Sequence, residues 1–218
     1  TGVQTCALPI LIFNLGWEKD TRDSALVPTR GSYTRLSGDF STLDLRYYML
    51  SAQQQYYLPI GTNYTLALNG IVDWGRSYGG RSYPVIKNVY AGGIGTVRGY
   101  EGASLGPRDS LTGDFLGGSR RMVGTAQLYL PVPGASRDRT LRWFVFGDVG
   151  RVGNTSGGCA AGRPGDIVDD ACGWRYSAGL GFSWQSPIGP LEISYGRALN
   201  AKPGDDKQAF QFQIGAGF

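Results

Sequence analysis

Few side chains in this sequence have the chemistry that catalysis or metal binding requires. The 218 residues include no histidine, and histidine is the commonest general base and metal ligand in proteins. A serine-based catalytic triad cannot be read from the sequence, because the histidine that usually activates the serine is missing. We therefore expect a protein that is not an enzyme, with no catalytic residues, no metal and no cofactor.

Two of the three cysteines are placed where a disulfide could form. Cys159 and Cys172 lie in the Gly/Asp-rich segment GGCAAGRPGDIVDDACG, at the two sides of a predicted loop. Two thiols in this arrangement form a disulfide bond in an oxidising compartment. The alternative is a pair of free surface thiols. The disulfide prediction therefore depends on an extracytoplasmic location.

A glycine-rich segment around Gly92, Gly93 and Gly95 is superficially similar to a phosphate-binding loop. It lacks the Gly-Lys-Ser/Thr sequence and the following helix of such loops, so no nucleotide is expected there. The VRGY sequence at residues 97–100 follows directly. Taken alone, VRGY could be an ordinary turn, since clustered glycines usually mark turns.

Alternation of apolar and polar residues is the dominant pattern along the chain and predicts strands. In WRYSAGLGFSWQ, the even-numbered residues from Trp174 to Trp184 are apolar, whereas the odd-numbered residues from Arg175 to Gln185 are small or polar. By the same criterion about nine strands are expected. They lie near residues 11–19, 31–41, 44–59, 63–76, 119–131, 140–152, 174–186, 190–199 and 209–218.

The composition and the connections favour a membrane barrel over a soluble sandwich. Only 17% of the residues are charged, compared with about 25% in ordinary soluble domains. Aromatic residues lie near the predicted strand ends, as in the girdles of outer-membrane barrels, and short proline-containing turns alternate with other, mostly longer loops. The basic residues are scattered, which gives nucleic-acid binding little support. We therefore predict an all-β, transmembrane antiparallel β-barrel.

The first ten residues, TGVQTCALPI, differ in character from the rest and resemble a translated sequencing-adapter scar. We therefore expect residues 1–10, with Cys6, to be non-native and residues 11–218 to be barrel. Bacterial single-chain barrels have an even number of strands, and an open sheet edge cannot lie in lipid. We expect further strands upstream.

Four segments resemble the BamA family of outer-membrane assembly proteins, within the surface antigen D15-like superfamily. They are VYAGGIGTVRGYEGASLGP, FVFGDVGRV, WQSPIGPLEISYGRAL and QAFQFQIGAGF, which together run through most of residues 89–218. The resemblance implies that this chain is the C-terminal part of a barrel of roughly sixteen strands. It also implies a location in the bacterial outer membrane.

The resemblance also implies a site inside the barrel. The family's loop arginine corresponds to Arg98, in the Val97-Arg98-Gly99-Tyr100 motif, and it meets acidic residues on the barrel wall. The family's aspartate corresponds to Asp148, whereas Gln127 stands where a glutamate is expected. An amide brings no charge, so the anchor would depend on Asp148. The alternative is that Asp148 is a solvated lumen residue without a partner.

The closing strand is the second element that the resemblance marks as functional. Its alternating apolar residues match the signal that assembly machinery reads in barrel proteins, and this signal is compatible with simple barrel closure. The residues concerned are Phe210, Phe212, Ile214 and Phe218.

The function implied by the resemblance is that of the membrane subunit that folds and inserts outer-membrane barrels. The expected partners are unfolded outer-membrane protein clients, outer-membrane lipid, and accessory lipoproteins that dock on periplasmic repeats upstream of this sequence. A client strand would pair with an opened barrel seam, which is β-augmentation. The alternatives are a two-partner secretion or translocation-module transporter and a passive porin.

Overall fold

The computed structural model of the chain describes residues 10–109, 112–132, 140–154, 172–186 and 189–215. Nine strands form one antiparallel sheet in the order β1-β2-β3-β4-β6-β7-β8-β9-β11. Their bounds are Ile10–Asp20 (β1), Gly31–Leu43 (β2), Tyr47–Ile60 (β3), Tyr64–Ser77 (β4), Arg120–Pro131 (β6), Leu141–Gly153 (β7), Arg175–Ser186 (β8), Gly189–Ala198 (β9) and Phe210–Ile214 (β11).

The sheet confirms the predicted all-β architecture and its nine strands. β3 begins at Tyr47 rather than near residue 44, because β2 ends at Leu43 with a left-handed φ of 71° and residues 44–46 form the turn. β1 begins at Ile10, which pairs with Leu43, and the expected non-native origin of residues 1–10 stays a prediction. Residues 1–9 lie outside the described part of the chain.

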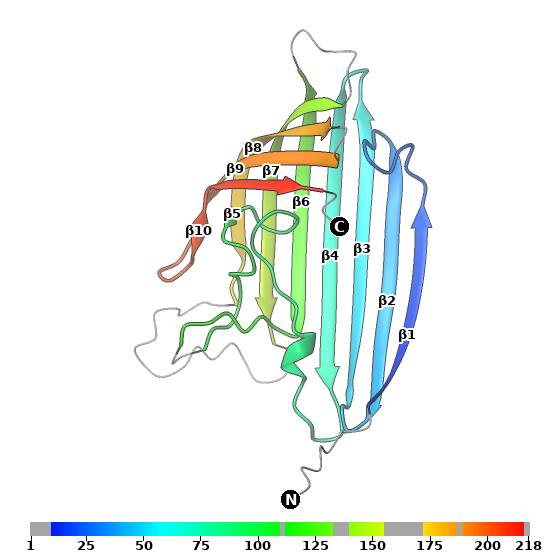
Figure 1. The fold of residues 1–218 in the computed structure, drawn as a ribbon, viewed down its shortest axis with the longest axis vertical. Coiled ribbons are helices and arrows are strands. Elements are labelled where there is room, and N and C mark those ends of the chain that lie inside the picture. Colours follow the sequence, from blue (N-terminus) through cyan, green and yellow to red (C-terminus); the bar gives the residue numbers. More distant parts are fainter. Residues whose placement is uncertain (1–9, 110–111, 133–139, 155–171, 187–188, 216–218) are drawn as a thin grey trace, which may run out of the picture.

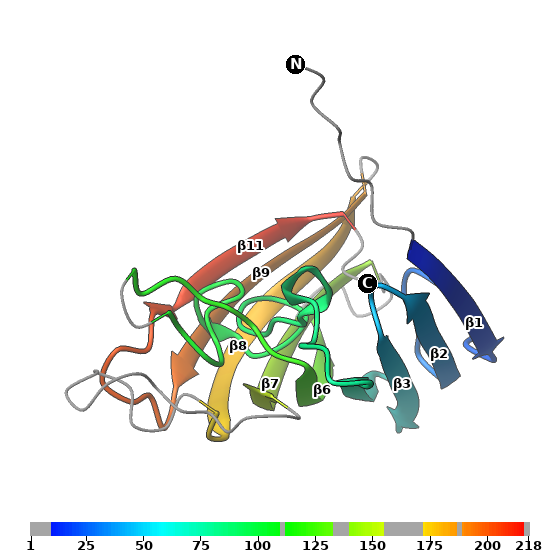
Figure 2. The same cartoon turned by 90° about the horizontal axis from the view of Figure 1, so that it is seen from below.

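The strands follow one another around an open, curved sheet, and the segment between β4 and β6 lies on its concave side (Figures 1 and 2). This segment, residues 78–119, is called the inner loop below. The connections at one end of the sheet are the inner loop, residues 154–174 and residues 199–209, together with the short β2–β3 turn. This end is called the long-loop end. In outer-membrane barrels, long loops are extracellular and short turns are periplasmic.

The two faces of the sheet differ in the way that alternation predicts. On β8, the Leu180 side of the strand is open, with Leu180 51% exposed, whereas Ser177 on the opposite side is 2% exposed. Large apolar side chains are exposed in the same register on the other sheet strands except β6, including Leu15, Leu50 and Trp143. A contiguous apolar surface of this kind faces lipid in an outer-membrane barrel. We call it the lipid face and the concave side the lumen face.

Three short elements lie outside the large sheet. The 3-10 helix η1 (Val85–Lys87) is in the inner loop, and β5 (Gly99–Tyr100) pairs with β10 (Lys207–Gln208). Alternation did not predict β5 and β10, because two residues are too few to display a period. The described residues contain no helix with the length and apolar character needed to cross a membrane.

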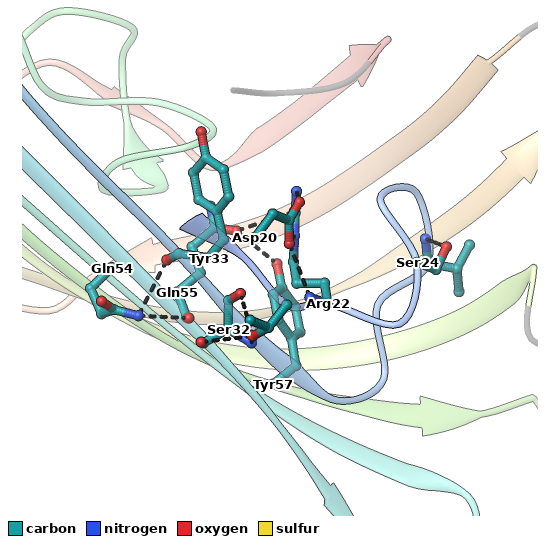
Figure 3. Close-up of polar contacts among 10 residues, drawn as sticks. Asp20, Arg22, Ser24, Ser32, Tyr33, Gln54, Gln55 and Tyr57 are labelled. Atoms are coloured by element: carbon teal, nitrogen blue, oxygen red, sulfur yellow. Dashed lines mark hydrogen bonds and ion pairs between the residues drawn. The ribbon is translucent and has the colours of Figure 1, made fainter. Parts of the chain in front are cut away.

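The connection between β1 and β2, residues 21–30, is fixed by polar contacts (Figure 3). Arg22 folds back on Asp20 and donates a hydrogen bond of 2.7 Å from Nη2 to Oδ2. Desolvation acts to raise the pKa of Asp23, but hydrogen bonds donated by Thr29 and Arg30 outweigh it and lower the pKa to about 2. An ionised side chain that accepts several backbone bonds is a common device for ordering a turn.

Candidate functional site

The inner loop presents its arginine from a compact, packed segment. Gly92 adopts φ +112°, and a Cβ there would lie 2.3 Å from the carbonyl oxygen of Glu101, so only glycine fits. The fold of the segment buries Val97 and Tyr100 completely, on either side of the Arg98-Gly99 dipeptide. These two side chains belong to an apolar cluster with residues from the sheet wall. The cluster consists of Ala91, Val97, Tyr100, Leu105, Val123 and Val152.

Arg98 lies against β7 and makes a two-pronged contact with Asp148. The guanidinium donates from Nε to Oδ2 at 2.8 Å and from Nη2 to Oδ1 at 2.9 Å. The backbone N–H of Arg98 donates to the same carboxylate at 3.0 Å. The two side chains are 4% and 0% exposed. Bidentate guanidinium–carboxylate pairs combine charge with a fixed geometry, so this contact orients the loop as well as holding it.

Two further side chains complete the polar shell of Arg98. Gln127 on β6 accepts a hydrogen bond from Nη1 at 2.8 Å, and Glu192 on β9 lies 3.4 Å from the same nitrogen. Glu192 supplies a second carboxylate that sequence reasoning missed. The sequence could have indicated Glu192 in one way only: it faces the lumen in a segment that resembles the family. Arg98, Gln127, Asp148 and Glu192 are called the arginine site below.

Two aromatic rings from β7 cover the remaining surface of the guanidinium. Its central carbon lies 3.5 Å from the ring centroid of Phe146 and 5.5 Å from that of Phe144. A cation over an aromatic face gains electrostatic stabilisation, which increases when water is excluded. The rings fit because β8 has glycines beside them. A Cβ at Gly181 would lie 2.2 Å from Phe144, and one at Gly179 would lie 2.7 Å from Phe146.

The inner loop is also attached to the end of the chain. Tyr100 pairs with Lys207 in the small β5–β10 sheet, and its carbonyl accepts a 2.7 Å hydrogen bond from the side chain of Gln211 on β11. Gly99 lies directly against β9, where a Cβ on Gly196 would approach the Gly99 nitrogen to 2.9 Å. The loop therefore contacts both of the last two strands of the sheet.

A second buried ion pair lies beside this attachment. Arg175, at the start of β8, donates to Asp205 from Nε to Oδ2 at 2.6 Å and from Nη2 to Oδ1 at 3.2 Å. Both side chains are almost fully buried. Burial and the negative charge of Asp205 raise the pKa of Tyr100 to about 12, so its phenol stays neutral at physiological pH. The sequence did not predict this pair, since its members lie 30 residues apart in different elements.

Replacing Gly99 by alanine is expected to loosen the inner loop. Gly99 has φ +87°, and its new Cβ would lie 3.1 Å from backbone atoms of Gly196 and Ala198. We expect a loss of roughly 1–3 kcal/mol in stability, from left-handed strain plus steric contact. Gly95 is a matched control, because it has the same φ of +87° and nothing within 4 Å of the added Cβ. Gly95→Ala should lower the melting temperature less than Gly99→Ala, and equal shifts would contradict the close packing.

The sequence-predicted site residues fall into two groups. The structure brings Val97, Arg98, Gly99, Tyr100, Gln127 and Asp148 together in and around the arginine site. The closing-strand residues Phe210, Phe212 and Ile214 lie on the lipid face of β11, whereas Phe218 is outside the described residues. Cys172 is disulfide-bonded, but Cys159 is outside the described part of the chain. Its pairing with Cys172 and the signal role of the closing strand stay predictions.

The lipid face, the curved antiparallel sheet and a loop fixed inside by a buried arginine define part of an outer-membrane β-barrel with an inward-folded loop. The chain belongs to the Omp85 superfamily, whose domain is matched over residues 10–218.

Similar proteins are known from bacteria and from a yeast. The outer membrane protein assembly factor BamA of Neisseria meningitidis is 36% identical over 94% of this chain and 28% of that protein. A SAM50-like protein of Schizosaccharomyces pombe is 24% identical over 93% of the chain and 43% of the relative. The crystal structure of BamA from Haemophilus ducreyi lacking POTRA domains 1–3 matches with a TM-score of 0.81 and 29% identity. That match covers 92% of this chain and 41% of the solved one, so the chain spans less than half of each of these three relatives.

Proposed function

We propose that the protein containing this chain folds and inserts β-barrel proteins into the bacterial outer membrane. The observation that carries the proposal is the 36% identity with an assembly factor over 94% of the chain. An alignment of this length includes the lumen-facing residues as well as those of the lipid face, and the arginine site lies within the aligned region. We infer that the residues inside the barrel serve the same activity.

The closing strand supplies a physical route for this activity. β11 pairs with β9 through Phe210–Ile214, and no other described strand pairs with its second edge. We propose that this second edge meets the first strand of the complete barrel at a weak seam, and that the opened edge accepts a client strand through backbone hydrogen bonds, which is β-augmentation. Unfolded outer-membrane proteins are the proposed clients, and outer-membrane lipid surrounds them during insertion. Accessory lipoproteins are proposed to bind periplasmic repeats of the full-length protein.

The arginine site is proposed to hold the inner loop in place while the seam opens. The partners of Arg98 come from β6, β7 and β9, whereas the seam proposed to open is at the second edge of β11. A loop anchored on the wall could therefore stay docked while the pairing at the edge changes. This arrangement would keep the lumen occupied during insertion.

Depletion of the full-length protein in its own host tests the proposal. We expect folded, heat-modifiable outer-membrane barrels of many kinds to decrease together and their unfolded forms to accumulate in the periplasm. A two-partner secretion or translocation-module transporter gives a different result, because only its own exported substrate would be lost. Normal amounts of folded barrels after full depletion, with one secreted protein missing, would replace the assembly role by the transport role.

A further inference from the structure

The charged residues of the lipid face are unevenly distributed. Along the nine sheet strands, the register that carries Leu15, Leu50 and Leu180 contains no acidic residue, and its basic residues are Lys19, Arg76, Arg120, Arg151 and Arg197. Lys19 lies at the end of β1, just before the connection to β2. The four arginines are all at the other end. We call them the outer arginine row.

Each member of the outer arginine row lies within two residues of the long-loop end of its strand. Arg76 is one residue from the end of β4, Arg120 begins β6, Arg151 is two residues from the end of β7, and Arg197 is one residue from the end of β9. Three of these strands are direct neighbours in the sheet. The row therefore follows the rim of the barrel at the end predicted to be extracellular.

Aromatic side chains indicate that this rim lies at the boundary between the hydrocarbon core of the membrane and its headgroup layer. Arg120 pairs across strands with Trp74 and lies 5.5 Å from its ring centroid, and Arg151 lies 5.4 Å from that of Trp174. Arg197 follows Tyr195 by two residues on the same face of β9. Tryptophan and tyrosine gather at the membrane–water interface. The guanidinium groups thus lie at headgroup level, where long basic side chains extend toward the polar layer.

The outer arginine row lacks the carboxylate partners that other arginines of the chain have. Arg98, Arg121 and Arg175 each contact an aspartate at 2.6–2.8 Å. Within the described residues, no member of the outer arginine row forms an ion pair. Arg120 donates a hydrogen bond to the carbonyl of Asn154, which leaves its charge uncompensated. Four unneutralised cations along one rim form an anion-binding surface.

We propose that the outer arginine row binds the phosphate groups of anionic lipid headgroups in the outer leaflet. Guanidinium groups match phosphate oxygens in a bidentate geometry. The surface faces sideways into the bilayer at headgroup level, so a lipid reaches it directly, whereas a soluble acidic protein would have to enter the membrane. The opposite rim has only Lys19 in this register among the described strands, so the site distinguishes the two leaflets. This lipid contact is independent of the proposed assembly role.

The test uses the purified full-length protein in nanodiscs of neutral phospholipid titrated with a diphosphorylated glycolipid, with bound lipid counted by native mass spectrometry. R120Q and R151Q should each weaken retention about fivefold, because a basic residue near an anionic surface contributes about 1 kcal/mol. Added salt should reduce binding of the glycolipid to the wild type more than to the R120Q/R151Q double variant. The matched control is K19Q, on the same face at the opposite end, and it should retain lipid normally. Heat-modifiable mobility in gels verifies that each variant is folded.

Three outcomes would overturn the proposal. The first is equal retention by the wild type and the folded R120Q/R151Q variant. The second is equal binding of the same glycolipid after removal of its phosphates. The third is an acidic polypeptide that binds the wild type and is lost from the double variant while lipid retention is unchanged, which would assign the row to a protein partner.

Discussion

Replacing Arg98 by alanine is expected to free the inner loop and to impair barrel assembly. The side chain is 4% exposed and makes two direct contacts with the carboxylate of Asp148. Surface ion pairs contribute about 0–1 kcal/mol, but breaking a buried pair costs about 3–5 kcal/mol because the remaining charge loses its partner without regaining water. Asp148→Ala should have a similar effect, since it leaves the guanidinium with Gln127 and the more distant Glu192.

A double-mutant cycle distinguishes a pair from two independent residues. Arg98→Ala combined with Asp148→Ala should cost little more than either change alone, because both remove one interaction. The measurements are protease cleavage within residues 85–105 and complementation of a depleted host. Arg98→Lys is an informative control, since lysine keeps the charge but not the bidentate geometry, and it should restore only part of the protection. Fully additive defects, with the loop equally protected in every variant, would show that the two residues act separately.

Introducing arginine at Leu180 should destabilise the barrel by roughly 2–4 kcal/mol if the residue lies near the bilayer midplane. Leu180 is in the middle of β8 and 51% exposed on the lipid face. Gln53→Arg is the control, because Gln53 is mid-strand in β3 and in the lumen-facing register. Gly179 is unsuitable as a lumen control, since even a Cβ would lie 2.1 Å from the carbonyl oxygen of Tyr195.

Unfolding in urea from lipid vesicles, followed by tryptophan fluorescence, measures both variants on one scale. Leu180→Arg should lower the free energy of unfolding by the stated amount, and Gln53→Arg should change it by much less. A larger loss for Gln53→Arg than for Leu180→Arg would reverse the assignment of the two faces.

The strands and their faces could be predicted because alternation is a local property of the sequence. Leu180 and Ser177 were assigned to opposite sides from β8 alone, and their exposures agree. The partners of Arg98 depended on tertiary packing. Asp148 was found through a resemblance, whereas Glu192 lies 94 residues from Arg98 and no local pattern links them. Gly179 and Gly181 looked like ordinary small lumen residues, but the rings of Phe144 and Phe146 occupy the space beside them.

The attachment of the inner loop to the end of the chain also determines when the arginine site can form. Every side-chain partner of Arg98 lies later in the sequence, and the hydrogen bond between Gln211 and Tyr100 spans 111 residues. Contacts of such high sequence separation form late, because a long chain segment must first be ordered. Arg98 therefore cannot acquire its full set of contacts until β9 has formed, and Tyr100 cannot acquire its hydrogen bond from Gln211 until β11 has formed. Protection of the inner loop from proteases therefore indicates that the last strands of the barrel have reached their native register.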